Sequence, residues 1–169
     1  MFKGTGITRR VDDIGRIIIP SDIRRRYHIK EGDSVEFGEN PDTIELRRYS
    51  PVARFDDQVK TIVHAFSDAM KMPVVLCDTY KVVTCKNTAS YDNQCISEEL
   101  YRCMKEPNED SSGVFFLKEH ETMSSKIVWI RGVNDIIGAL IIPESSKETT
   151  QTHEDYLKIC AKVIERVVS

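Results

Sequence analysis

The feature that most constrains the fold is a run of three β-branched residues, Ile17-Ile18-Ile19, that ends at Pro20. Successive side chains of a strand point to opposite faces, so a strand that is apolar throughout must be covered on both sides. Around this run the sequence predicts another short strand at 7–11, a short helix at 21–27 and a β-hairpin at 35–46. Four short strands and one short helix bury too little surface to fold alone. We therefore expect a second copy of the chain to supply the missing face, in an obligate homodimer.

Positive charge gathers in this same region. The 169 residues contain 24 Lys plus Arg and 27 Asp plus Glu, for a net charge of −3. Residues 1–30 nevertheless hold eight basic and three acidic groups, and most of the basic groups are arginine. The planar guanidinium binds phosphates and guanine edges through two N–H groups. A homodimer would carry two symmetric basic patches, an arrangement that suits duplex DNA. The alternative is an ordinary solvated charged face.

The residues of this region also form a motif. The segment 5–20, followed by Ile23-Arg24-Arg25 and Glu31-Gly32-Asp33, contains the pattern D-x-x-G-R-[IV]-x-[IL]-P. It resembles the AbrB-type swapped-hairpin domain of bacterial transition-state regulators. The resemblance implies that two chains interleave hairpins into one all-β barrel with a short helix, and that arginines on the barrel contact double-stranded DNA. The residues at the family's DNA-contacting or usually basic positions are Arg9, Arg10, Arg16, Arg24 and Arg25. Arg26 is an additional charge at a position where the family often has an uncharged residue.

Beyond an expected linker at 51–55, residues 56–169 alternate between helical and strand-like patterns. They predict an α+β domain in which an antiparallel sheet is flanked by helices. The order of elements is similar to that of GAF-type sensor domains. The expected elements are a helix at 55–70, strands at 73–77 and 81–85, a shorter helix near 96–103, strands at 113–117, 126–131 and 136–142, and a C-terminal helix with Thr152 as its N-cap.

An AbrB-type domain at 1–50 followed by a GAF-like domain resembles the arrangement of sporulation-stage regulators. This resemblance implies a DNA-binding transcriptional regulator of sporulation-stage genes that is not an enzyme. It would act in the cytoplasm, associated with the nucleoid of the forespore. Tetramer formation through the C-terminal helices and a small-molecule ligand of the GAF-like domain stay open, as do the operator sequence and the sign of regulation.

Two other functional classes remain as alternatives. Antitoxins share the N-terminal pattern, but their toxin-binding tail should be short and poor in core residues, unlike residues 56–169. Some GAF-fold proteins reduce methionine sulfoxide with paired cysteines, and Cys77, Cys85, Cys95 and Cys103 lie in the first half of this domain. Cys77 and Cys103 occupy apolar positions, where buried inert thiols are more common.

Neither a cofactor nor a metal is expected. The five cysteines and four histidines lack the spacing of a structural or catalytic metal site. Four aromatic residues could line a ligand pocket or belong to the core: Tyr91, Phe115, Phe116 and Trp129. The longest apolar stretch, residues 136–142, is far shorter than the roughly 20 residues of a membrane-spanning helix. The N-terminus also lacks an apolar run typical of a secretory signal, so we expect a cytoplasmic protein with no membrane partner.

Overall fold

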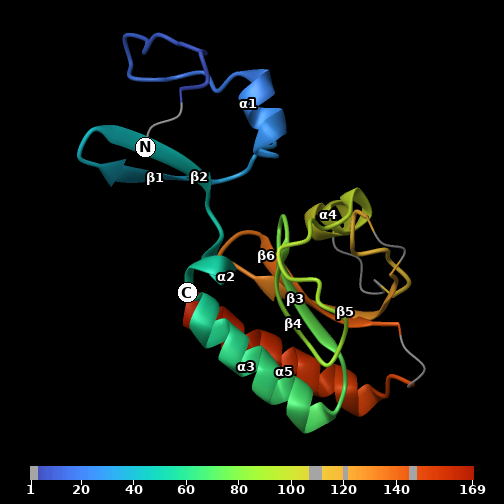
Figure 1. Ribbon diagram of the computed structural model, residues 1–169. Helices are drawn as coiled ribbons and strands as arrows, with labels where there is room; N and C mark the ends of the chain where they lie inside the picture. Colours follow the sequence, from blue (N-terminus) through green and yellow to red (C-terminus); the bar gives the residue numbers. More distant parts are fainter. Residues whose placement is uncertain (1–3, 107–111, 120–121, 145–147) are drawn as a thin grey trace. The chain divides into compact units, whose positions relative to one another are not determined.

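The computed structural model describes residues 4–106, 112–119, 122–144 and 148–169 (Figure 1). The chain divides into two compact units, residues 1–49 and residues 50–169. We call them the N-terminal unit and the C-terminal unit, and describe each separately.

The N-terminal unit contains a short helix and one hairpin. Helix α1 (Ser21–Arg26) follows Pro20, and strands β1 (Val35–Asn40) and β2 (Thr43–Arg48) pair antiparallel. The segments 7–11 and 17–19, which we expected to be strands, form none in the single chain. A strand needs a neighbouring strand for its backbone N–H and C=O groups. Within residues 4–49, β1 and β2 pair with each other and offer these segments no partner.

Residues 4–49 contain no hydrophobic core of their own. Among residues 4–49 no hydrophobic side chain is buried, and nine large ones are exposed. The most exposed are Ile18 at 78%, Ile44 at 71%, and Phe37 and Ile14 at 66%. A soluble chain rarely leaves so many apolar side chains in contact with water over so few residues, because each costs free energy that burial would recover. The others are Val11, Ile17, Tyr27, Leu46 and Tyr49.

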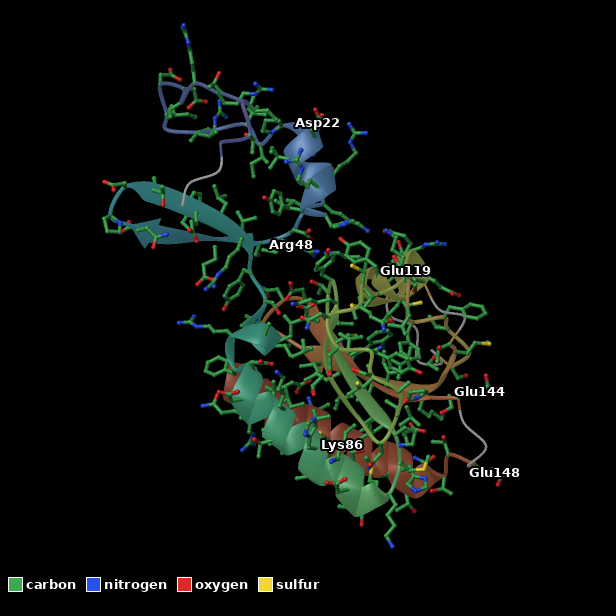
Figure 2. All side chains as sticks on the ribbon, in the orientation of Figure 1. Asp22, Arg48, Lys86, Glu119, Glu144 and Glu148 are labelled. Atoms are coloured by element: carbon green, nitrogen blue, oxygen red, sulfur yellow. The ribbon has the colours of Figure 1, made fainter. Side chains whose placement is uncertain are left out.

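One ion pair is well shielded in this unit. Arg48 Nη2 lies 3.2 Å from Asp33 Oδ2, and their side chains are only 14% and 6% exposed. Asp33 Oδ2 also accepts a hydrogen bond from the Lys30 backbone N–H at 2.8 Å. The pair ties the turn before β1 to the end of β2, where Figure 2 shows Arg48.

The C-terminal unit is built on a four-stranded antiparallel sheet with the order β4-β3-β6-β5. Its strands are β3 (Val74–Asp78), β4 (Val82–Lys86), β5 (Ser124–Arg131) and β6 (Ile136–Pro143). Every residue of the central strands β3 and β6 is buried. This burial explains why their sequences are continuously apolar rather than alternating.

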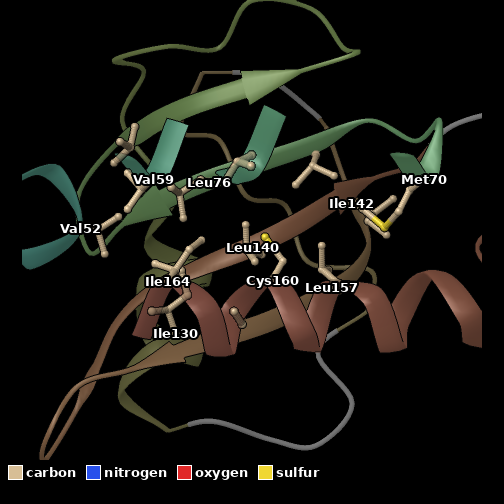
Figure 3. Packing of buried hydrophobic residues seen from close by; sticks show 14 of the residues in the cluster. Val52, Val59, Met70, Leu76, Ile130, Leu140, Ile142, Leu157, Cys160 and Ile164 are labelled. Carbon is tan, nitrogen blue, oxygen red and sulfur yellow. The ribbon is translucent and has the colours of Figure 1, made fainter. Parts of the chain in front are cut away.

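Helices cover one face of the sheet. Helices α2 (Pro51–Arg54), α3 (Asp56–Met70) and α5 (Gln151–Val168) pack on this face, with α3 and α5 side by side (Figure 1). Figure 3 shows side chains from these helices meeting those from the sheet. The cluster includes Val52, Val59, Leu157, Cys160 and Ile164 from the helices and Leu76, Leu140 and Ile142 from the sheet.

A second cluster covers the other face. Helix α4 (Glu98–Lys105) contributes Leu100 and Met104, and the loop residue Phe116 is fully buried with them. These residues pack against the strand positions that alternate with those of the first cluster, such as Val75 and Ile141. The expected α+β architecture, an antiparallel sheet flanked by helices, is therefore confirmed for this unit.

Three details differ from expectation. Residues 51–55, expected as a linker, contain α2, and Val52 has no exposed surface because it packs in the first cluster. The strand expected at 113–117 is reduced to isolated pairings, Phe115 with Met123 and Leu117 with Ile96.

The third difference is the cap of α5. The N-cap is Thr150, not Thr152, because the Thr150 hydroxyl accepts from the His153 backbone N–H at 3.4 Å. His153 Nδ1 accepts in return from the Thr150 backbone N–H at 3.1 Å. This reciprocal arrangement is a capping box in which histidine takes the place of the usual glutamate or glutamine.

Candidate nucleic-acid interface

A tight turn places Arg16. The Gly15 backbone N–H donates to the Asp12 carbonyl oxygen at 3.1 Å, and the Asp12 N–H donates to the Arg16 carbonyl at the same distance. Gly15 has φ of 82°, a conformation that residues with a side chain rarely adopt. The sequence Asp-x-x-Gly-Arg therefore folds locally into a closed loop with an arginine at its end.

The Asp12 carboxylate accepts hydrogen bonds from other residues of this loop. Its Oδ1 accepts from the backbone N–H groups of Arg16 at 2.7 Å and Ile14 at 3.2 Å, and its Oδ2 accepts from Arg16 Nε at 2.7 Å. The bond from the Arg16 backbone N–H, followed by that from the Arg16 side chain, lowers the pKa of Asp12. Since the carboxylate stays ionised, the contact with Arg16 is a charge-assisted one. The Arg16 side chain remains 73% exposed.

Helix α1 presents further arginines. Arg25 Nη2 lies 2.6 Å from Asp22 Oδ1, one turn earlier, and the Arg25 side chain is 80% exposed. Figure 2 labels Asp22 on this helix. Arg24 and Arg26 are also exposed, and α1 has no buried residue. Within the single chain only Ile23 of this helix is partly covered, and its other residues are exposed.

Arg9 and Arg10 lie in a segment without regular secondary structure. Both are exposed, and Arg9 Nη1 donates to the Thr8 carbonyl oxygen at 2.8 Å. All five predicted arginines are therefore solvent-exposed in the N-terminal unit, in two separate segments, 9–16 and 24–25. The guanidinium groups of Arg10 and Arg24 form no hydrogen bond or ion pair with any residue that the structure describes.

Sequence reasoning did not single out the carboxylates that hold two of these arginines. Asp12 is the first residue of the motif D-x-x-G-R, and Asp22 is one of the three acidic groups of residues 1–30. The signal that could have identified them is their spacing, four residues before Arg16 and three before Arg25, which permits ion pairs within a turn. Arg47 has a different role, because its Nε pairs across the hairpin with Glu36 Oε2 at 2.8 Å.

The C-terminal unit contains a cavity of about 390 Å³. It lies between α4 and the turn from β5 to β6, and its lining includes Tyr101, Lys105, Arg131 and Asn134. None of the four aromatic residues considered for either a pocket or the core lines this cavity. Tyr91 instead packs edge-to-face on the buried Phe116 ring, with centroids 6.0 Å apart.

Four of the five cysteines have the character of unreactive thiols. All five are free; Cys77 and Cys160 are buried, and burial raises the pKa of Cys160 to about 12 and that of Cys77 further still. Burial also raises the pKa of Cys85 and of Cys103. The thiolate is the reactive form, so at neutral pH these four groups are poor nucleophiles. Among the described residues, no group of three or more metal-ligating side chains lies together, and no helix is long and apolar enough to span a membrane.

Known proteins resemble the two units separately. The family model of the MazE antidote-toxin recognition domain, a bacterial antitoxin, matches residues 8–54. The GAF domain from Acinetobacter phosphoenolpyruvate-protein phosphotransferase has a TM-score of 0.51 and 10% identity, covering 70% of this chain and 90% of that domain. The fold and the N-terminal match together define a class of protein in which a small AbrB/MazE-type β region precedes a GAF-like α+β domain.

A relative that covers most of the chain narrows this class further. Stage V sporulation protein T of Bacillus subtilis is 36% identical over 150 residues, which cover 83% of this chain and 84% of that protein. The chain belongs to the family of stage V sporulation protein T. The transition state regulatory protein AbrB and the regulator Abh, both of B. subtilis, are each 43% identical over 50 residues, or 30% of this chain. They cover 52% and 54% of those two proteins.

Proposed function

We propose that this protein is a DNA-binding transcriptional regulator of sporulation-stage genes that acts in the cytoplasm on the nucleoid. One observation carries the proposal: five exposed arginines lie within residues 4–49, in which the structure describes no buried hydrophobic side chain. Family membership supports it, since AbrB is by name a transition state regulatory protein. Arg9, Arg10, Arg16, Arg24 and Arg25 would hold phosphates and probe the major groove.

The DNA-binding form would be a dimer of interleaved hairpins. The segments 7–11 and 17–19 lack strand partners in the single chain. Four apolar residues in and between them are exposed, namely Val11, Ile14, Ile17 and Ile18. A second chain that supplied both the missing strands and the missing cover would complete a swapped-hairpin barrel. It would also double the arginine set, so that two half-sites of one duplex could be bound at once.

A second association surface is proposed on α5. Tyr156, Ile159 and Val163 are 47%, 52% and 37% exposed and recur at helical spacing on one face. Packing of these faces against each other would join two dimers into a tetramer. The GAF-like unit could then transmit ligand binding at its cavity to the spacing of the DNA-binding units. The charged residues that line this cavity are Lys105, Arg131 and Asp135, and the excess of one positive charge favours an anionic ligand.

The test compares Arg16→Ala with Arg102→Ala in the full-length chain. Both remove one exposed arginine, but Arg102 lies on α4 of the C-terminal unit. We expect Arg16→Ala to weaken binding to duplex DNA and to reduce the slope of log K against log salt by about 0.9 for each phosphate that the variant no longer binds. Arg102→Ala should bind as the wild type does. Full affinity and an unchanged slope in Arg16→Ala would contradict the assignment of Arg16.

The other functional classes separate in the same preparations. A methionine sulfoxide reductase would turn over methionine sulfoxide in the presence of a thiol reductant. An antitoxin would co-purify with a small toxic ribonuclease. A fragment comprising residues 50–169, which contains both hydrophobic clusters, should keep its fold and lose DNA binding.

A further inference from the structure

The Arg16 guanidinium is held from one side only. Its Nε lies 2.7 Å from Asp12 Oδ2. Its two terminal nitrogens, Nη1 and Nη2, form no hydrogen bond or ion pair with any of the described residues. Both are therefore available to donate together, in the plane of one rigid group.

Arg25 is held in a different way. Its bond to Asp22 Oδ1 uses Nη2, so one member of its terminal pair is already occupied. An end-on contact with two acceptors requires both terminal N–H groups, as in binding to O6 and N7 of guanine or to two phosphate oxygens. Of these two ion-paired arginines, Arg16 is the one whose end-on donor pair is complete.

Asp12 is itself fixed in place. Its Oδ1 accepts two backbone hydrogen bonds, from Ile14 and Arg16, while Oδ2 meets the guanidinium. The carboxylate therefore cannot rotate without breaking these three hydrogen bonds. The orientation of the arginine is therefore set by the backbone of residues 12–16, through one carboxylate.

We propose that Asp12 is a positioning residue that holds Arg16 by its Nε, so that Nη1 and Nη2 make an end-on, two-point contact with duplex DNA. The inference rests on the proposed function. It predicts that neutralising Asp12 weakens DNA binding, whereas the loss of a negative charge alone would strengthen it. A carboxylate beside DNA repels phosphate, so its neutralisation should strengthen binding unless the carboxylate organises a cation.

Asp13 provides a matched control. It is the next residue in the same turn, is exposed, and forms no side-chain hydrogen bond or ion pair with the part of the chain that the structure describes. Asp12→Asn and Asp13→Asn each remove one negative charge at nearly the same place. Asparagine at position 12 keeps a side-chain oxygen for the backbone N–H groups of Ile14 and Arg16, so the turn can still close.

The experiment measures binding of full-length variants to a duplex that the wild-type protein selects from a randomised library. We expect Asp13→Asn to bind as tightly as the wild type or more tightly. Asp12→Asn should bind about 2- to 10-fold more weakly for each chain of the dimer, because a released arginine must be ordered on binding. In an Arg16→Ala background, both substitutions should have the same effect on affinity.

Three results would overturn the inference or its premise. Equal affinities of Asp12→Asn and Asp13→Asn, with Arg16→Ala weakened, would refute the positioning role and leave the proposed function intact. A weakening by Asp12→Asn that persists in the Arg16→Ala background would make Asp12 a structural residue only. Full affinity in Arg16→Ala would instead remove the DNA contact of Arg16 from the proposed function.

The same titrations distinguish the two acceptors that the inference allows. If Arg16 binds phosphate, Asp12→Asn should reduce the salt slope and weaken binding to all duplexes alike. If it binds a guanine edge, the slope should stay unchanged and discrimination should relax at one base position.

Discussion

Replacing Ile17 by serine should weaken association of the N-terminal units without unfolding the rest of the chain. Ile17 is 58% exposed in the single chain, and the proposed barrel would bury it. Complete burial of such a side chain contributes about 1.5–3 kcal/mol, so the exposed part is worth about 0.9–1.7 kcal/mol in each chain. Two copies in one dimer correspond to a rise of about 20- to 300-fold in the dimer dissociation constant.

The assay must report on the N-terminal unit alone, because α5 offers a second association surface. Hydrogen exchange of peptides from residues 4–49, measured against protein concentration in mild urea, meets this need. In Ile17→Ser, the protein concentration at which these peptides are half protected from exchange should rise by the same factor as the dimer dissociation constant. Val133→Ser is the control, since Val133 is 96% exposed in the turn after β5. Identical midpoints for Ile17→Ser and Val133→Ser would refute the proposed burial of Ile17.

Three further predictions concern the C-terminal unit. Gly138→Ala should destabilise it by about 3 kcal/mol or more, because the new Cβ would lie 2.5 Å from the Cys77 carbonyl oxygen. Urea unfolding, followed by the fluorescence of the single tryptophan, measures the free energy of unfolding. A destabilisation below about 1 kcal/mol would contradict the prediction. Thr150→Ala should cost about 1 kcal/mol and Thr152→Ala close to nothing, so equal effects on the free energy of unfolding would be inconsistent with the cap. The Cys160 thiol, with its pKa raised to about 12, should react with a thiol reagent only as fast as the protein opens; fast labelling of the native protein would show that it is accessible.

Most of the C-terminal unit could be predicted from its apolar patterns. Long helices and buried strands carry strong periodic or continuous signals, and α3, α5, β3 and β6 lie close to the expected positions. Helix α2 was missed because four residues are too few to show periodicity. Ser50 and Pro51 gave the only local indication, an N-cap followed by proline.

The candidate site was predicted in part. The arginines could be identified from a motif, and all five are exposed. What each side chain contacts depends on geometry that composition does not reveal. Arg16 and Arg48 illustrate the difference, because one is paired with a carboxylate in its own turn and remains exposed, whereas the other is shielded against Asp33. That second pair joins residues fifteen positions apart, and only the fold of the hairpin brings them together.

The absence of a hydrophobic core within residues 4–49 has a consequence for how DNA binding depends on protein concentration. If the proposed dimer supplies the apolar interior of this unit, the concentration of the DNA-binding form rises with the square of the chain concentration as long as most chains are unassembled. A modest change in synthesis then produces a larger change in operator occupancy. Chains interleaved as proposed would exchange partners only after their hairpins separate, so exchange between dimers should be slow.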